Sequence, residues 1–190
     1  KMMDNLTLPF FLFVQEALIL LGGSAQLCAQ IVREIFPLQT KLLAEQIYQV
    51  GVRSFWLIFI TAFSTGMVMS LQFGLGLEKF GGKLYVPKLV ALSIVREMGP
   101  VFTSLMLAAR VGAGMASEIG SMVVTQQIDA IRALGTSPIQ KIVVPRVLAC
   151  LLVVPLLGAI ANLAGIVGGT IVGATELGLD PQFYILKVLS

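Results

Sequence analysis

The sequence VLACLLVVPLLGAIANLAGIVGGTIVGAT, residues 147–175, contains no charged residue over 29 positions. A helix that spans the hydrocarbon core of a bilayer needs about 20 mostly apolar residues, because each residue adds about 1.5 Å of length. This segment therefore predicts a membrane-spanning helix. Its excess length predicts that the helix is tilted or kinked, and Pro155 supplies a site for the kink.

The rest of the chain shares this apolar character. Of its 190 residues, 57% are hydrophobic and 12% are charged, and the mean hydropathy is +0.93. An ordinary soluble domain is about 25% charged, so a soluble chain of this composition could not cover its own surface with polar groups. A second uncharged run lies between Arg53 and Glu78. We therefore expect an all-α integral membrane protein whose spanning helices lie at about 47–78, 87–117 and 145–175.

The polar residues exclude several classes of function. The net charge of +3 comes from 13 Lys and Arg against 10 Asp and Glu, and the basic residues are dispersed, so no nucleic-acid binding is expected. The chain has no histidine, so we expect neither a catalytic site of the Ser–His or Cys–His type nor a metal site. Cys28 and Cys150 each lie alone in an apolar stretch, which predicts small buried residues rather than a disulfide.

The N-terminal segment is more polar than a typical spanning helix. A helix is expected over residues 5–36, where Glu16 and several glutamines interrupt the apolar residues and Pro37 ends the pattern. We interpret residues 1–37 as an interfacial or elbow helix that lies in the membrane surface. An ordinary first spanning helix is the alternative. Residues 38–190 then form a single transmembrane domain.

The second expected span carries charges within its apolar sequence. Arg96 and Glu97 lie about two turns into it, and a charge in the bilayer costs at least roughly 2.5 kcal/mol, so such residues are treated as functional by default. Neighbours in a helix point about 100° apart, so these two need not pair with each other. They predict a polar pocket near one end of the bundle, unless the membrane interface extends this far. Arg110, Gly114 and Glu118 share one face nearer the other end, where snorkelling is the simpler explanation.

The connector at 118–146 has an amphipathic helical pattern. Its apolar stripe consists of Val124, Ile128 and Ile131. Gly135 ends the helix, and Pro138 lies in the turn that follows. A short amphipathic helix that lies parallel to the membrane between two spans is suited to docking on a soluble partner. A solvated surface helix with no partner is the alternative.

Small residues recur at helical spacing in two of the expected spans. In the third span they form a row that consists of Ala161, Gly165, Gly169 and Gly173, and in the second span the row includes Gly112 and Ala116. Small residues let two helix backbones approach closely in lipid. The pattern predicts tight packing, either inside one subunit or at a seam between subunits.

Several motifs in order give the chain a specific resemblance. The sequence resembles the MlaE-type permeases, the membrane subunits of MCE-linked ABC transporters, which move phospholipids or other lipids across the cell envelope. The resemblance covers most of residues 40–175. It rests on Arg96-Glu97-Met98-Gly99-Pro100-Val101, Ala109-Arg110-Val111-Gly112-Ala113, Glu118-Ile119-Gly120-Ser121-Met122, Thr125-Gln126-Gln127-Ile128-Asp129-Ala130, Leu134-Gly135 and Val144-Pro145-Arg146.

The resemblance implies an architecture and a set of partners. Members of the family have an interfacial N-terminal helix and five spanning helices, and two copies form the membrane part. Two ATPase subunits, which carry ATP and Mg²⁺, bind below, an MCE-domain protein sits outside, and a small STAS-domain protein often binds inside. The resemblance places 118–146 in the cytoplasm, 78–88 in the periplasm and the whole protein in the inner membrane. Because the family continues through two more spans, we expect this chain to be truncated after Ser190.

The resemblance also implies site residues. Arg96 and Glu97 would line the lipid cavity, and residues 118–135 would form the coupling helix that rests in a groove of the ATPase. The residues expected to contact the ATPase are Glu118, Thr125, Gln126, Gln127, Asp129 and Arg132. Family members commonly have Glu at the position of Gln126, so this chain lacks any ion pair made there.

These observations lead to one expected function and two alternatives. We expect a permease subunit of an ABC transporter that moves phospholipid or a related lipid between membranes. The chain has no phosphate-binding glycine loop with Lys and Ser/Thr, so a partner must handle ATP. The first alternative is an ATPase-independent secondary transporter or channel subunit that uses Arg96, Glu97 and Arg110 as an ion path. The second is a scaffold subunit that transports nothing.

Overall fold

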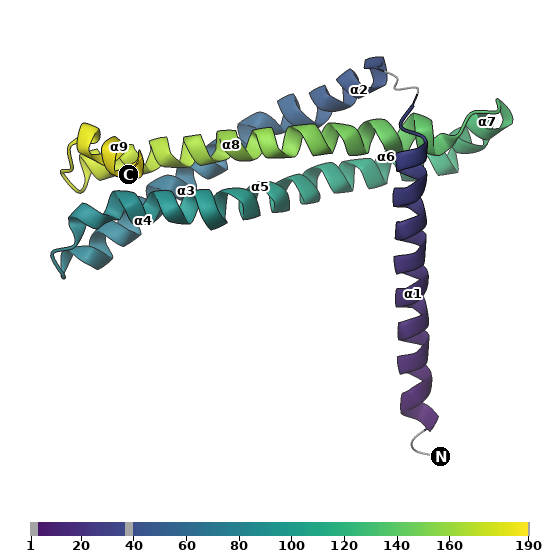
Figure 1. Ribbon diagram of the computed structural model, residues 1–190, viewed down its shortest axis with the longest axis horizontal. Helices are drawn as coiled ribbons and strands as arrows, with labels where there is room; N and C mark the ends of the chain where they lie inside the picture. Colours follow the sequence, from purple (N-terminus) through teal and green to yellow (C-terminus); the bar gives the residue numbers. More distant parts are fainter. Residues whose placement is uncertain (1–3, 37–39, 190) are drawn as a thin grey trace.

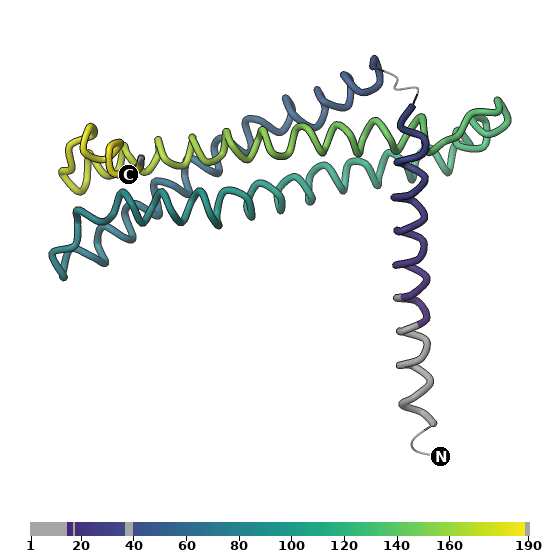
Figure 2. Tube along the Cα trace, viewed as in Figure 1, coloured from purple at the N-terminus to yellow at the C-terminus, as the bar shows by residue number. Residues whose placement is uncertain are grey.

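The computed structural model describes residues 4–36 and 40–189, and the described residues are helical with short turns and no strand. Three helical stretches are long and apolar enough to cross a membrane: Thr40–Glu78, Lys83–Val124 and Ile139–Thr175. The chain trace runs along the bundle with these stretches side by side (Figure 2). The expected all-α membrane architecture with three clear spans is therefore confirmed.

Each long stretch is built from consecutive helical segments. The first contains α2 (Thr40–Ile47), the π-helical η1 (Tyr48–Val52) and α3 (Arg53–Glu78). The second contains η2 (Lys83–Tyr85), α4 (Val86–Ser93), η3 (Ile94–Met98), α5 (Gly99–Leu107), η4 (Ala108–Gly112) and α6 (Ala113–Val124). The third contains η5 (Ile139–Val143) and α8 (Val144–Thr175), which continues through Pro155 without a break. The π-helical turns η3 and η4 hold Arg96, Glu97 and Arg110, and such turns often mark functional sites.

The N-terminal helix lies apart from the bundle. α1 (Asp4–Arg33) runs crosswise to the three long stretches and meets them near its C-terminal end (Figure 1). There Ser137 donates a hydrogen bond from its hydroxyl to Oε2 of Glu34, at 2.6 Å. A helix crosswise to the spans has the direction of one that lies in the membrane surface, as an interfacial helix does. Because α1 packs against little else, Cys28 is exposed rather than buried as expected, and it is free, as is Cys150.

The connector is divided differently from the expected helix at 118–135. Residues 118–124 continue the second long stretch as part of α6, because nothing in them breaks a helix. The chain then turns at Gln126, which has a left-handed backbone conformation with φ of 56°, and the separate helix α7 spans Gln127–Ala133. Gly135, with φ of 73°, ends this helix region as expected.

Close contact between α3 and α8 holds the bundle together. A Cβ atom on Gly66 would overlap the carbonyl oxygen of Gly165, and a Cβ on Gly168 would overlap that of Phe63, so the two backbones touch. The larger apolar cluster joins side chains from all three stretches: Val50, Ile58, Leu107, Val153, Leu157 and Ala161. A second cluster includes Val86, Val90 and Ile94 of the second stretch with Leu177, near the short helix α9 (Pro181–Leu189).

Candidate functional site

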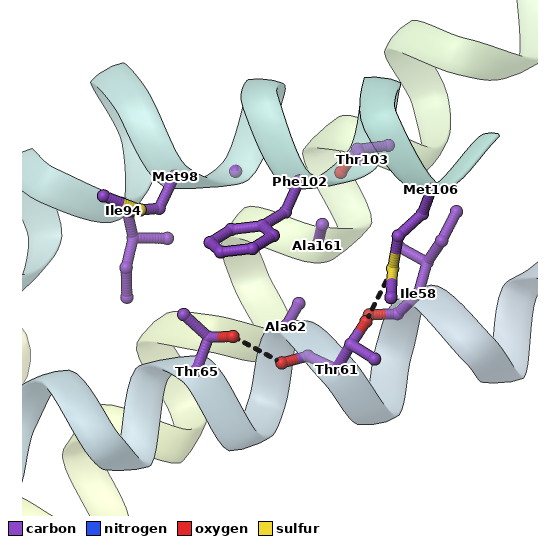
Figure 3. A pocket seen from close by; sticks show the side chains of 11 residues that line it. Ile58, Thr61, Ala62, Thr65, Ile94, Met98, Phe102, Thr103, Met106 and Ala161 are labelled. Carbon is purple, nitrogen blue, oxygen red and sulfur yellow. Dashed lines mark hydrogen bonds between the residues drawn. The ribbon is translucent and has the colours of Figure 1, made fainter. Parts of the chain in front are cut away.

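A narrow pocket with apolar walls lies where α3, η3–α5 and α8 meet. Figure 3 shows Phe102 and Met106 of α5 facing Thr61, Ala62 and Thr65 of α3 across it. Its enclosed volume is about 20 Å³. The two threonine hydroxyls donate to carbonyls of their own helix: Thr61 to Leu57 at 2.8 Å and Thr65 to Thr61 at 2.7 Å. With these hydroxyls satisfied, the α3 wall of the pocket suits hydrocarbon rather than a polar ligand.

The pocket continues into a wider groove on the surface between α3 and α5. The groove has a volume of about 290 Å³ and shares Thr65, Met98 and Phe102 with the pocket. Its other lining residues are Ser64, Val68, Met69 and Gln72 of α3. Methionine side chains are flexible and adapt to irregular apolar partners. The pocket and the groove together form one continuous, mostly apolar surface that could hold an acyl chain.

Arg96 and Glu97 lie on a different face of the second stretch. Both are exposed on η3, and neither forms an ion pair with any residue the structure describes. Arg96 lines an open groove of about 510 Å³ together with Lys88 and Lys187, whereas Glu97 does not line this groove. The structure therefore does not bring Arg96 and Glu97 into one pocket within this chain. It gives Arg96 two cationic neighbours and an apolar groove floor.

The helix α7 and the turn before it present five of the six residues expected to contact an ATPase. It projects beyond the end of the bundle, on the side opposite the turn that joins α3 to the second stretch (Figure 1). Asp129 and Arg132 form an exposed ion pair at 3.3 Å. The Thr125 hydroxyl donates to the carbonyl of Ser121 at 2.8 Å, and Thr125, Gln126 and Gln127 are exposed. These five residues thus form one solvent-facing group.

Glu118 differs from this group because it lies on α6 inside the bundle end. Its Oε2 forms an ion pair with Nη2 of Arg146, at 2.7 Å. Arg146 is only 5% exposed, whereas the side chain of Glu118 is 43% exposed. The pair ties the end of the second stretch to the start of the third, across the base of the connector. The sequence analysis named Glu118 as a site residue and quoted Arg146 only as part of a family motif, so it did not predict that the two residues pair.

The two rows of small residues have different environments. Gly165, Gly169 and Gly173 are buried inside the chain, where Gly169 and Gly173 pack against Tyr184 of α9. Gly112 and Ala116 are exposed, and a Cβ on Gly112 would meet no heavy atom within 4 Å. The row on α8 therefore packs within one subunit. The sequence analysis did not predict close packing at Gly66, Gly99 or Gly168, because these positions are not part of the two regularly spaced rows.

An all-α bundle with a projecting connector helix and intramembrane charges defines a polytopic membrane protein with the features of a permease. The chain matches the Permease MlaE family over residues 43–190. This match covers more than half of the chain, and the chain belongs to the MlaE permease family.

Several relatives are similar over most of this chain. A probable ABC transporter permease protein of Rickettsia felis is 38% identical over 149 residues, which are 78% of this chain and 58% of the relative. A probable ABC transporter permease protein of Synechocystis is 37% identical over 76% of this chain and 55% of the relative. The intermembrane phospholipid transport system permease protein MlaE of Haemophilus influenzae is 35% identical over 78% of this chain and 56% of the relative. The chain thus spans a little over half the length of these relatives.

Proposed function

We propose that the chain is the permease part of an ABC transporter that moves phospholipid between membranes and sits in the inner membrane. The observation that carries this proposal is the exposed helix α7, which projects from the bundle end in a member of the MlaE permease family. A separate ATPase holds ATP and Mg²⁺ and receives α7 in a groove. An MCE-domain protein on the opposite side of the membrane exchanges the lipid with the permease, and a STAS-domain protein binds on the ATPase side.

Motion of the ATPase reaches the bundle through the root of the connector. The pair between Glu118 and Arg146 joins both ends of the connector, so a push on α7 moves the second and third stretches together. The backbone contact between Gly66 and Gly165 then carries the displacement of α8 to α3. Because packed helices shift between discrete arrangements rather than deforming continuously, this motion can open or close a cavity.

The lipid contacts two features that the second stretch separates. The cationic Arg96 attracts the lipid phosphate, because Arg forms strong charge-assisted hydrogen bonds with phosphate oxygens. The apolar groove between α3 and α5 takes an acyl chain. Glu97 lies beside Arg96, and its negative charge lowers the electrostatic potential at the phosphate. A second copy of the chain completes the cavity, and the exposed Gly112 and Ala116 belong to the seam between the two copies.

The coupling role is tested by a pull-down of the full-length protein in mild detergent. Asp129→Arg should abolish co-purification of an ATPase, because it reverses the charge of an exposed residue on α7. Asp180→Arg, at the opposite end of the bundle, is the matched control and should leave the ATPase bound. If no ATPase co-purifies even with the unmodified protein, the ABC permease proposal fails. An ATPase-independent transporter that uses Arg96, Glu97 and Arg110 then becomes the better explanation.

The phosphate role of Arg96 is tested by lipid transport in cells. Arg96→Ala should reduce transport, whereas Lys79→Ala, an exposed cation near the turn after α3, should not. Intact transport with Arg96→Ala removes this residue from the lipid path and leaves the ATPase coupling untouched.

A further inference from the structure

A polar cleft lies at the connector end of the bundle, away from the acyl-chain groove. It consists of two adjoining pockets of about 270 and 230 Å³, which share Gln46, Gln49 and Glu118 as lining residues. Its walls come from α2, η1 and the start of α3 in the first stretch, from η4 and α6 in the second, from Ile131 of α7, and from the start of the third stretch. The three long stretches, which are distant in the sequence, thus meet around one polar space.

Cations outnumber carboxylates in this cleft. The cationic lining residues are Arg53, Arg110, Lys141 and Arg146. The acidic lining residues are Glu45 and Glu118, and Glu118 is already paired with Arg146. Arg110 donates from Nη1 to the backbone carbonyl of Arg53, which fixes its guanidinium at the wall between the first and second stretches. The cleft therefore has a positive excess that its own carboxylates do not neutralise.

The buried guanidinium of Arg146 lacks one partner. Nη2 of Arg146 binds Glu118, but Nη1 is buried and has no hydrogen-bond acceptor among the described residues. The hydroxyl of Ser54, in the wall of the neighbouring pocket, is also buried, and no described residue forms a hydrogen bond with it. A buried donor without an acceptor costs about 1–3 kcal/mol, and more when the group is charged. Such donors beside a cationic cleft favour a ligand with anionic oxygens.

We propose that this cleft binds the phosphate headgroup of an anionic phospholipid from the leaflet on the connector side. Guanidinium groups match the geometry of phosphate oxygens, and basic pockets between transmembrane helices on the cytoplasmic side are known to hold lipid headgroups. The cleft also lies at headgroup depth: Trp56, one turn into α3 from Arg53, is 67% exposed, as an interfacial aromatic anchor would be.

This site is distinct from the one proposed for the transported lipid. Arg110 lies 14 positions after Arg96 on the same continuous stretch, which corresponds to about 21 Å along a helix axis. A lipid held there would bridge the first, second and third stretches at the root of the connector. It would therefore stabilise the arrangement from which α7 projects, and it need not be transported. The inference does not depend on the proposed transport function.

The test uses native mass spectrometry of the full-length protein. It measures the fraction of protein that still carries phosphatidylglycerol after lipid has been removed in detergent. Arg110→Gln and Lys141→Gln should each weaken retention about fivefold, because each removes one basic residue near an anionic headgroup. Lys79→Gln is the matched control at the other end of the bundle and should have no effect. Arg110→Lys, which keeps the charge, should retain most of the lipid. Equal retention by all variants would overturn the proposal.

Two further arms identify the ligand. Phosphatidylcholine, which has no net charge, should be retained less than phosphatidylglycerol, and inorganic phosphate in excess should not displace the lipid. Displacement by inorganic phosphate would assign the cleft to a free anion and overturn the lipid proposal. Photo-crosslinking of unmodified protein with a headgroup-labelled phosphatidylglycerol should mark peptides that contain residues 45–54 or 110–118. If crosslinks occur only in peptides at the end of the bundle near Arg96, the proposal is overturned. This outcome does not depend on the folding of any variant.

Discussion

At the scale of single residues, Gly99 shows how one missing side chain permits a tertiary contact. Oδ1 of Asn162 on α8 occupies the place where a Cβ of Gly99 would stand, and the carbonyl of Ile94 lies close as well. Gly99 also precedes Pro100, which cannot donate a backbone hydrogen bond, so the helix is already loosened there. The absence of a side chain lets α5 approach α8 beside the apolar pocket.

Gly99→Ala is therefore expected to destabilise the protein. The added methyl group must displace Asn162 or the helix backbone, which costs about 1–3 kcal/mol in a well-packed interior. Thermal unfolding of the full-length protein in detergent, followed by far-UV circular dichroism, measures the loss. Gly158→Ala is the control, because a Cβ there meets no heavy atom within 4 Å. If both variants unfold at the temperature of the unmodified protein, the close approach at Gly99 is wrong.

The pair between Glu118 and Arg146 is a second contact that depends on individual residues. Glu118→Ala would leave the buried Arg146 without its carboxylate, and breaking a buried pair on one side costs about 3–5 kcal/mol. Since Glu118 is partly exposed, we expect Glu118→Ala to lower the free energy of unfolding by about 1–3 kcal/mol in the same assay. Exchanging the two residues (Glu118→Arg with Arg146→Glu) should recover part of the loss. No recovery would mean that the contact is not the source of the stability.

At the scale of elements, the packing of α3 on α8 determines the geometry of the bundle. Gly66 on α3 and Gly165 and Gly168 on α8 let the two backbones touch, and packing rather than hydrophobicity drives association of helices in lipid. Arg96, Glu97 and Arg110 of the second stretch lie in π-helical turns, where the altered rotation changes the face on which each side chain emerges. This rotation separates Arg96 from the apolar pocket that Ile94 and Met98 line.

Gly66→Ala should disrupt this helix pair. Its Cβ would overlap the carbonyl oxygen of Gly165, a backbone atom that cannot rotate away, so the helices must separate. We expect a loss of about 1–3 kcal/mol, seen as a lower unfolding temperature in detergent. Gly76→Ala on the same helix meets no heavy atom within 4 Å and should be neutral or more stable by about 0.5–1 kcal/mol. A larger effect at Gly76 than at Gly66 would contradict the packing.

At the scale of the whole molecule, the arrangement places the two kinds of turn at opposite ends of the bundle. The turn between α3 and the second stretch lies at one end, and α7 lies at the other (Figure 1). Three spans of alternating direction require that these ends face opposite sides of the membrane. Glu34, the residue after α1, accepts a hydrogen bond from Ser137 of the connector, so the C-terminal end of α1 lies at the same end of the bundle as the connector.

Labelling of single cysteines tests this topology. In a background with Cys28→Ala and Cys150→Ala, we expect Phe80→Cys and Leu134→Cys to react with a membrane-impermeant maleimide from opposite sides of the membrane. Phe80 is 84% exposed in the turn after α3, and Leu134 is 79% exposed after α7, so both positions are accessible. Intact and permeabilised cells distinguish the two sides. Reaction of both cysteines from the same side would contradict a bundle of three spans.

The sequence by itself determined the class of the protein and the position of its spans. Runs such as 147–175 are uncharged over more residues than are needed to cross a bilayer. Because a backbone in hydrocarbon must satisfy its own hydrogen bonds, local composition is enough to predict that these runs are helices. The turn at Gly135 and the amphipathic connector were also predictable, because they depend on residues close in the chain. The ordered series of motifs between Arg96 and Arg146 predicted the family.

Only the tertiary structure decided which residues meet. The pairing of Glu118 with Arg146, the contact of Gly66 with Gly165 and the polar cleft depend on the rotation and offset of helices that are far apart in the sequence. The expected helix at 118–135 was divided at Gln126 because a left-handed residue other than glycine gives no strong local signal. The faces on which Arg96 and Glu97 emerge are likewise set by a π-helical turn. A linear pattern does not encode these rotations, because they come from the packing of one helix against another.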